Sequence, residues 1–295
     1  MTARPPRVSI GLPVYNGEEY LDDALASARR QSFEDIEIIV SDNGSTDGTS
    51  DLCRQAAAED DRVVYRRYDE NRGGGWNYMN VARLARGEYF TWLAADDVKL
   101  PGFTGSCVEL LDADGRAAFA CSRAQVIDEQ GVVIETLHDG AMGLDAPDAA
   151  ARVRNLLRAQ ASHVVYGLIR SSVLRQTRGM IAMVGDDIVL NTELLCRGPM
   201  LQSDEFLFRP RRHGAQLSQQ GHEQVRWHAP RAAVRFAFPQ TRLNAELFRA
   251  VARAPLPAGE KVRAWSAVAS SWVVPRWRGM ARDVAVAAGW PVPAP

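Results

Sequence analysis

The sequence lacks paired cysteines. Its four cysteines, Cys53, Cys107, Cys121 and Cys196, lie far apart along the 295 residues, and none belongs to a CxxC pair. A zinc site built on cysteine pairs is therefore not expected. A reduced, cytoplasmic compartment fits this cysteine usage best.

Long apolar runs are also missing. No run approaches the roughly 20 residues that a membrane-spanning helix needs. Residues 1–7 carry no apolar segment typical of a signal peptide. We expect a soluble, cytoplasmic chain, and contact with the inner face of a membrane stays open.

No charge of one sign dominates. The 35 basic and 36 acidic residues give a net charge of -1, so no overall field favours nucleic acid as a partner. Arginine becomes frequent and acidic residues sparse after Arg209, which indicates a basic C-terminal face. The hydrophobic fraction of 46% is ample for one large domain or two modest ones.

The first third of the chain alternates between apolar runs and amphipathic stretches. We predict strands at 8–12, 36–40, 63–68 and 88–93, and helices at 20–30, 49–58 and 76–85. This alternation is typical of an α/β fold with a mostly parallel sheet and helices on both faces, as in Rossmann-like proteins. Ligands of such sheets bind beyond the carboxyl ends of the strands, where four polar or glycine-rich loops would meet.

The fourth of these strands stops on two adjacent carboxylates, Asp96 and Asp97. Two buried acids repel each other and lose hydration, so a positive partner is expected beside them. Mg²⁺ or Mn²⁺ is the natural candidate, since such ions bridge carboxylates to phosphates. The alternative is an exposed turn that caps a helix starting near Leu100. Gly73–Gly75 is no phosphate-binding P-loop, because no Gly-Lys-Ser/Thr follows.

The second half is less regular. Strands are predicted at 117–126, 132–135, 164–170 and 201–208, and helices at 147–159, 188–196, 229–254 and 259–274. We divide the chain into 1–115, 116–225 and a C-terminal helical extension (226–295). The tryptophans and arginines of the extension are packing residues, or they contact a membrane surface.

Four clusters, 8–18, 41–47, 71–73 and 87–97, resemble family 2 glycosyltransferases in order and spacing. The resemblance implies a GT-A fold and inverting transfer of a sugar from a nucleoside diphosphate sugar, with UDP or dTDP favoured. It makes 1–115 the nucleotide-sugar-binding half and 116–225 the acceptor-binding half, and the extension could contact a lipid-linked acceptor. The acceptor would be a carbohydrate, lipid-linked or small-molecule hydroxyl, in cell-surface polysaccharide or natural-product synthesis. The oligomeric state stays open.

The resemblance also implies roles for donor-binding residues. Pro13, Tyr15 and Glu18 fall in the first nucleotide-binding loop. Asp42 would hydrogen-bond the pyrimidine base, and Arg72 would lie near the base or the diphosphate.

The resemblance gives Asp96 a contact with the ribose or with the water shell of the metal, and it makes Asp97 the direct metal ligand. Many relatives carry a third aspartate where this chain has Ala94. This difference bears on the expected contacts with the ribose and not on activity.

Inverting transfer needs a general base. The resemblance places it at Gly185-Asp186-Asp187, with Asp187 as the base and Asp186 in reserve. The alternative is a pair of acids that only caps the following helix.

A basic loop near residue 213 resembles a loop that closes over the diphosphate in relatives. His213 would ligate the metal, and Arg211 and Arg212 would pair with phosphates. The alternative is a solvated basic loop.

Two other functions compete with transfer. A sugar-phosphate nucleotidyltransferase would carry a Gly-rich, basic loop after the first strand, whereas the loop here is acidic (Pro-Val-Tyr-Asn-Gly-Glu-Glu). A non-catalytic nucleotide-sugar or glycan-binding protein would bind a donor without turning it over. The presence of Asp96, Asp97 and Asp187 together favours an enzyme.

Overall fold

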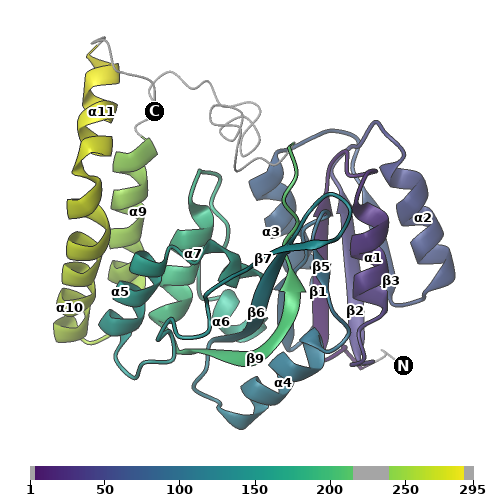
Figure 1. The fold of residues 1–295 in the computed structure, drawn as a ribbon, viewed down its shortest axis with the longest axis horizontal. Helices are drawn as coiled ribbons and strands as arrows, with labels where there is room; N and C mark the ends of the chain where they lie inside the picture. Colours follow the sequence, from purple (N-terminus) through teal and green to yellow (C-terminus); the bar gives the residue numbers. More distant parts are fainter. Residues whose placement is uncertain (1–3, 215–238, 289–295) are drawn as a thin grey trace.

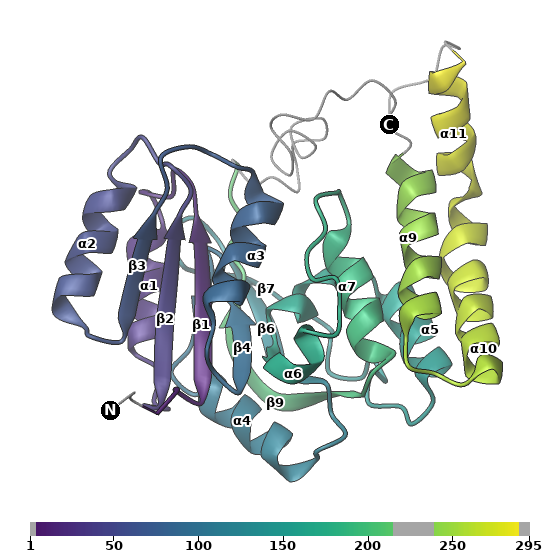
Figure 2. The same cartoon turned by 180° about the vertical axis from the view of Figure 1, so that it is seen from behind.

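The computed structural model describes residues 4–214 and 239–288 (Figure 1). It is an α/β protein with one central sheet, and its C-terminal helices form a separate layer at one end of the molecule (Figures 1 and 2).

The first four strands are parallel and lie in the order β3-β2-β1-β4. They are β1 (Val8–Val14), β2 (Ile36–Asp42), β3 (Val63–Arg67) and β4 (Tyr89–Trp92). The helices between them are α1 (Leu21–Arg29), α2 (Thr49–Glu59) and α3 (Gly74–Leu84). The predicted strand-helix alternation is confirmed, and the parallel strands bring the loops after β1, β2 and β4 to one edge.

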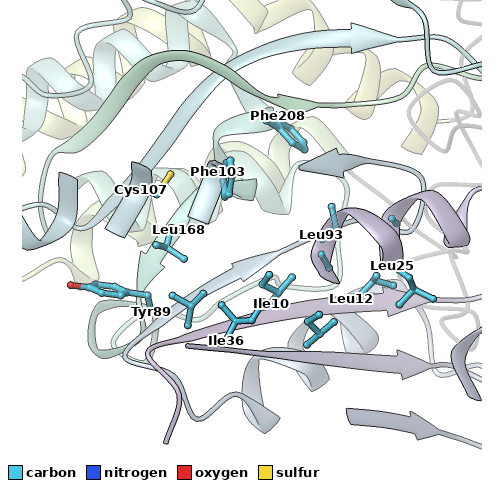
Figure 3. Packing of buried hydrophobic residues seen from close by; sticks show 14 of the residues in the cluster. Ile10, Leu12, Leu25, Ile36, Tyr89, Leu93, Phe103, Cys107, Leu168 and Phe208 are labelled. Atoms are coloured by element: carbon cyan, nitrogen blue, oxygen red, sulfur yellow. The ribbon is translucent and has the colours of Figure 1, made fainter. Parts of the chain in front are cut away.

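The core on one face of these strands contains apolar side chains from α1, α2 and the strands themselves (Figure 3). Ile10 and Leu12 of β1 pack there with Leu25 of α1. On the other face Val81 of α3 packs against Phe90 in a second core. Both faces of β1, β2 and β4 are therefore buried, as continuous apolar runs require.

The second half adds strands to the same sheet, in the order β4-β8-β6-β9-β5. These are β5 (Val98–Lys99), β6 (Phe119–Ile127), β8 (Leu168–Arg170) and β9 (Met200–Arg209), and β7 (Val133–Thr136) pairs with β6. β8 is antiparallel to β4 and β6, whereas β6 and β9 are parallel. The helices are α4 (Phe103–Ala113), α5 (Ala149–Ala159), α6 (Ser171–Leu174) and α7 (Asp186–Leu195).

One predicted strand is wrong in its first part. Within 164–170 only β8 is a strand, because η1 (Ser162–Tyr166) forms a 3-10 helix. The apolar Val164 and Val165 are buried by this helix rather than by strand pairing. The short strand β5, which pairs with the end of β9, was not predicted.

The C-terminal layer consists of α9 (Pro239–Arg253), α10 (Ala258–Val268) and α11 (Trp277–Ala287), with η3 (Ala269–Val273) and η4 (Val274–Arg276) between the last two. Leu247 of α9 and Val268 of α10 share a third core with Val153 of α5 and Val189 of α7. The predicted helix 229–254 is confirmed over α9, and 229–238 lie outside the described residues. Helix α11 was not predicted. None of the described helices is long and apolar enough to cross a membrane.

Candidate active site

The loops after β1 and β2 support each other at the carboxyl edge of the sheet. Pro13 lies in register with Ser41 of β2, and Tyr15 beyond it is exposed. Glu18 accepts a hydrogen bond from the backbone N–H of Gly48 (2.7 Å), at the start of α2. A carboxylate is favoured there by the free N–H groups and by the helix dipole. Glu18 therefore fixes the loop in which the sequence predicted nucleotide contacts.

Asp42, the predicted partner of the base, is fully buried at the end of β2. Its Oδ1 accepts from the backbone N–H of Ser45 (2.8 Å). Its Oδ2 accepts from the Tyr65 hydroxyl and from the Arg67 guanidinium, both at 2.9 Å. A carboxylate offers about four lone-pair positions, so three internal bonds leave one acceptor position unfilled, and a base that reaches it must displace the covering side chains of Tyr65 or Arg67.

Arg72 stands at the rim of the same edge. Its guanidinium carbon lies 4.8 Å from the ring centre of Trp76 and 5.3 Å from that of Tyr68. Its backbone N–H donates to Asn43 (3.1 Å), which ties the loop after β3 to the loop after β2. The aromatic rings hold a half-exposed cation where a base or a diphosphate would meet the sheet edge.

Asp96 and Asp97 form a turn directly after β4. Asp97 is only 5% exposed, and its Oδ1 accepts from the backbone N–H of Arg211 (2.9 Å). The alternative of an exposed helix cap is wrong, because Gly102 is the N-cap of α4 and Asp97 is buried. The two carboxylates sit where the sequence placed them, at the carboxyl end of a buried strand.

Arg211 fastens this turn to its surroundings. Its Nε donates to the carbonyl of Asp96 (2.9 Å) and its Nη1 to the carbonyls of Asp128 and Glu129 (3.1 Å each). Its Nη2 pairs with Asp23 of α1 (2.7 Å). The sequence predicted a phosphate ligand or a solvated side chain here, whereas this guanidinium is buried and donates into the protein.

His213 lies beside the turn, and its role as a metal ligand stays a prediction. Its Nε2 lies 3.0 Å from Oδ2 of Asp96, and its ring packs on Tyr20 at 4.8 Å. The hydrogen bond to Asp96 raises the pKa of His213. The neighbouring Arg212 instead forms a half-exposed ion pair with Glu135 (2.7 Å).

The charges around Asp97 bear on whether this turn could hold a divalent cation. Burial, and then the charge of Asp96, raise the pKa of Asp97 well above its usual range, although Arg211 and Lys99 act in the opposite direction. Within the described ranges no group of three or more acidic, histidine or cysteine side chains is arranged to hold a metal alone. One or two carboxylates suffice for Mg²⁺, however, when substrate phosphates supply the other ligands. The two adjacent carboxylates of this turn fit such a shared cation.

The second acidic pair begins α7. Gly185 is the N-cap with φ of 83°, and Asp186 and Asp187 are the first helical residues. Burial and the charge of Asp187 raise the pKa of Asp186 well above its usual range, and burial raises the pKa of Asp187. Oδ1 of Asp186 accepts from the backbone N–H of Asp187 (3.0 Å), and Oδ1 of Asp187 accepts from that of Ile188 (2.8 Å), so both acids also satisfy N–H groups of the first helical turn.

Sequence reasoning missed a pair of tyrosines that come from distant segments. The Tyr78 hydroxyl on α3 lies 3.3 Å from the Tyr166 hydroxyl on η1. Burial raises the pKa of Tyr78, and the charges of Asp96, Asp97 and Asp186 act in the same direction.

Lys99 lies behind the turn and was also missed. Its ammonium donates to the carbonyls of Trp92 (2.9 Å) and Tyr166 (2.7 Å) and to the hydroxyl of Thr91. Burial lowers the pKa of Lys99 to about 7. The only signal in the sequence was its place two residues after Asp97, and a surface lysine would show the same spacing.

A sequence model of glycosyl transferase family 2 matches residues 9–160, just over half of the chain. The chain belongs to glycosyl transferase family 2. This glycosyltransferase is 27% identical, over 186 residues, to a Campylobacter jejuni protein named GalNAc(5)-diNAcBac-PP-undecaprenol beta-1,3-glucosyltransferase, and the match covers 63% of this chain and 58% of that one. Other curated relatives are covered over only 20 to 38% of their length.

Solved structures share the fold of this glycosyltransferase. Staphylococcus aureus TarS 1-349, solved in complex with UDP-GlcNAc, superposes with a TM-score of 0.65 and 13% identity, over 95% of this chain and 80% of that one. The mannosyltransferase PcManGT of Pyrobaculum calidifontis, in complex with GDP-Man and Mn²⁺, gives a TM-score of 0.60 and 16% identity, over 99% and 77%. The GT-A-type architecture implied by the sequence is confirmed.

Proposed function

We propose that this glycosyltransferase transfers one sugar, with inversion, from a UDP- or dTDP-sugar to an acceptor hydroxyl. One observation carries the proposal: the carboxylates of Asp96 and Asp97 lie together at the carboxyl edge of the sheet, in a turn that Arg211 and His213 from the second half of the chain contact. Such a turn can share a cation with a diphosphate, and the acidic pair at the start of α7 can take a proton.

The donor would occupy the edge formed by the loops after β1, β2 and β3. Tyr15, the remaining acceptor position of Asp42, and Arg72 surround the place for the nucleotide. Asp97, with Asp96 and His213 beside it, would hold Mg²⁺ or Mn²⁺ together with the diphosphate. Such a cation offsets the charge of the departing diphosphate.

Asp187 would act as the general base. It removes the proton from the acceptor hydroxyl as that oxygen bonds to the sugar carbon and the bond to the diphosphate breaks. Burial raises the pKa of Asp187 towards the working pH, which suits proton transfer better than an ordinary carboxylate does. Asp186 beside it stays the reserve candidate.

The acceptor is a carbohydrate, a lipid-linked glycan or a small molecule, and cell-surface polysaccharide synthesis at the inner face of the membrane is the setting we favour. The name of the Campylobacter jejuni relative, a transferase acting on an undecaprenol-linked glycan, supports this choice. The complexes of TarS with UDP-GlcNAc and of PcManGT with GDP-Man support a nucleotide-sugar donor.

The test is release of nucleoside diphosphate from a panel of UDP-, dTDP- and GDP-sugars, with Mg²⁺, with Mn²⁺ and with EDTA. We expect metal-dependent release from one donor, abolished in Asp97→Asn. Asp187→Asn should retain donor binding but lose transfer. Asp204→Asn, an exposed aspartate on β9, is the matched control and should behave like the wild type. Binding of a donor without release or transfer under any condition would indicate a non-catalytic binding protein instead.

A further inference from the structure

Helix α11 and the η4 turn before it carry an apolar stripe that residues 4–214 and 239–288 leave uncovered. Val274, Trp277, Ala281 and Val284 follow each other at spacings of three, four and three residues, so they lie on one face. Val274 is 64% exposed, and Trp277 and Val284 are each 57% exposed. Large apolar side chains repeated on one exposed helical face indicate a contact surface rather than chance exposure.

The opposite face of the helix packs inward. Helix α11 lies against α9, with Gly279 close to Gln240 (Figures 1 and 2). Asp283, the one acidic residue of α11, is buried and accepts hydrogen bonds from the N–H (2.8 Å) and hydroxyl (2.9 Å) of Thr241. The protein therefore removes the negative charge of this helix from the exposed side.

Arginines flank the stripe. Arg278 and Arg282 each follow a stripe residue by one position and are exposed. The guanidinium carbon of Arg278 lies 5.8 Å from the ring centre of Trp277, and that of Arg276 lies 3.6 Å from Trp272. Apolar and aromatic side chains bordered by arginines on one helix are typical of helices that lie in a membrane interface.

We propose that one face of η4 and α11, formed by Val274, Trp277, Ala281, Val284, Arg278 and Arg282, docks on an anionic lipid surface. Tryptophan and valine would enter the boundary between headgroups and acyl chains, and the arginines would bind lipid phosphates.

A second copy of the chain fits this face less well. A two-fold contact through α11 would set Arg278 and Arg282 against their own copies, and the buried Asp283 offers no exposed partner charge on this helix. Helix α11 lies near the predicted acceptor-binding half (116–225), and α2 lies at the far end of the molecule (Figure 1). Docking through α11 would therefore bring the predicted acceptor-binding half towards the lipid.

The experiment measures binding of the full chain to phosphatidylcholine vesicles with and without phosphatidylglycerol, by co-sedimentation. The chain should bind the phosphatidylglycerol vesicles, and binding should weaken with added salt because the Debye length shortens. Each arginine adds about fivefold to partitioning onto an anionic surface, so Arg278→Gln/Arg282→Gln should lower it about 25-fold. Trp277→Ala should lower it about tenfold by losing one inserted aromatic side chain.

Arg154→Gln/Arg158→Gln on α5 is the matched control, with the same change of net charge away from the stripe, and should stay within about twofold of the wild type. Equal loss in both arginine pairs would overturn the proposal in favour of unspecific attraction. No binding of the wild type to phosphatidylglycerol vesicles would overturn it outright. A dimer in solution that Trp277→Ala dissociates would reassign the face to a second copy. None of these readouts needs a donor or an acceptor, so failure here is separate from failure of the proposed transfer.

Discussion

Replacement of Arg211 by alanine should both destabilise the protein and loosen the acidic turn. Its guanidinium donates to three backbone carbonyls, of Asp96, Asp128 and Glu129, and it is buried. Hydrogen bonds from a charged donor contribute about 1.5 kcal/mol or more each, and truncating one partner of a buried pair costs about 3–5 kcal/mol. We discount the pair with the mostly exposed Asp23 and expect a loss of about 4 kcal/mol.

The neighbouring residue provides the control. Arg212 pairs with Glu135 at a similar distance, but both side chains are about half exposed. Water and salt screen such a pair, so Arg212→Ala should cost less than about 1 kcal/mol. The two arginines differ by one position in the chain and carry the same charge. Any difference between the variants therefore reports burial and hydrogen bonding.

Urea unfolding of both variants, followed by circular dichroism, measures the difference directly. Arg211→Ala should unfold at a clearly lower urea concentration, and its metal-dependent hydrolysis of the donor should fall because the carbonyl of Asp96 loses its anchor. Arg212→Ala should match the wild type in both assays. Equal unfolding midpoints for the two variants would refute the assignment of Arg211 as the anchor of this turn.

Three further predictions concern buried groups. The pKa of Asp186 is raised in the folded state, so its carboxylate lowers the stability of the protein once the pH exceeds the pKa of this group in the unfolded chain. Asp186→Asn should therefore melt at a higher temperature than the wild type at pH 7.5 and lose that advantage near pH 4. The pKa of Lys99 is lowered to about 7 in the folded protein. Between pH 7 and 10.5 the free energy of unfolding of the wild type should therefore rise by about 1.4 kcal/mol per pH unit relative to that of Lys99→Met, as measured by urea unfolding. Tyr78→Phe and Tyr166→Phe should each lower kcat or raise the KM for the donor about tenfold, and the melting temperature should not change. A fall in melting temperature without a change in these kinetic constants would show that the tyrosine pair is only structural.

The first third of the chain was readable from the sequence because its signals are local. Strands β1, β2 and β4 are mostly apolar segments that are buried at every position. Asp42 ends β2, and Tyr15 and Arg72 follow β1 and β3 within a few positions. The fold therefore places them by connectivity alone.

Local signals failed where a different structure satisfies the same pattern. Val164-Val165-Tyr166 reads as a strand, because two β-branched residues and an aromatic residue favour extended backbone. The structure buries both valines in a 3-10 turn instead. Pro275 reads as the end of a helix, yet it lies in the first turn of η4, where its missing N–H breaks no hydrogen bond. The chain therefore runs on into α11.

The parts of the site that join distant segments were beyond the sequence. Tyr78 and Tyr166 are 88 positions apart, and nothing near either residue indicates that their hydroxyls meet. The burial of Arg211 could not be predicted either, because a basic loop predicts exposed arginines. Only the tertiary structure shows that Arg211 points inward to the carbonyl of Asp96, whereas Arg212 stays at the surface.

The charges around the acidic turn bear on how a donor would bind. Arg211 and Lys99 beside the turn are buried and donate largely to backbone carbonyls, and His213 contacts Asp96. Burial, and then the charge of Asp96, raise the pKa of Asp97 well above its usual range. The two adjacent carboxylates would repel a diphosphate that arrives without a cation. Chelation should therefore weaken donor binding as well as turnover, and the EDTA arm of the release assay, read alongside a nucleotide titration, separates these two effects.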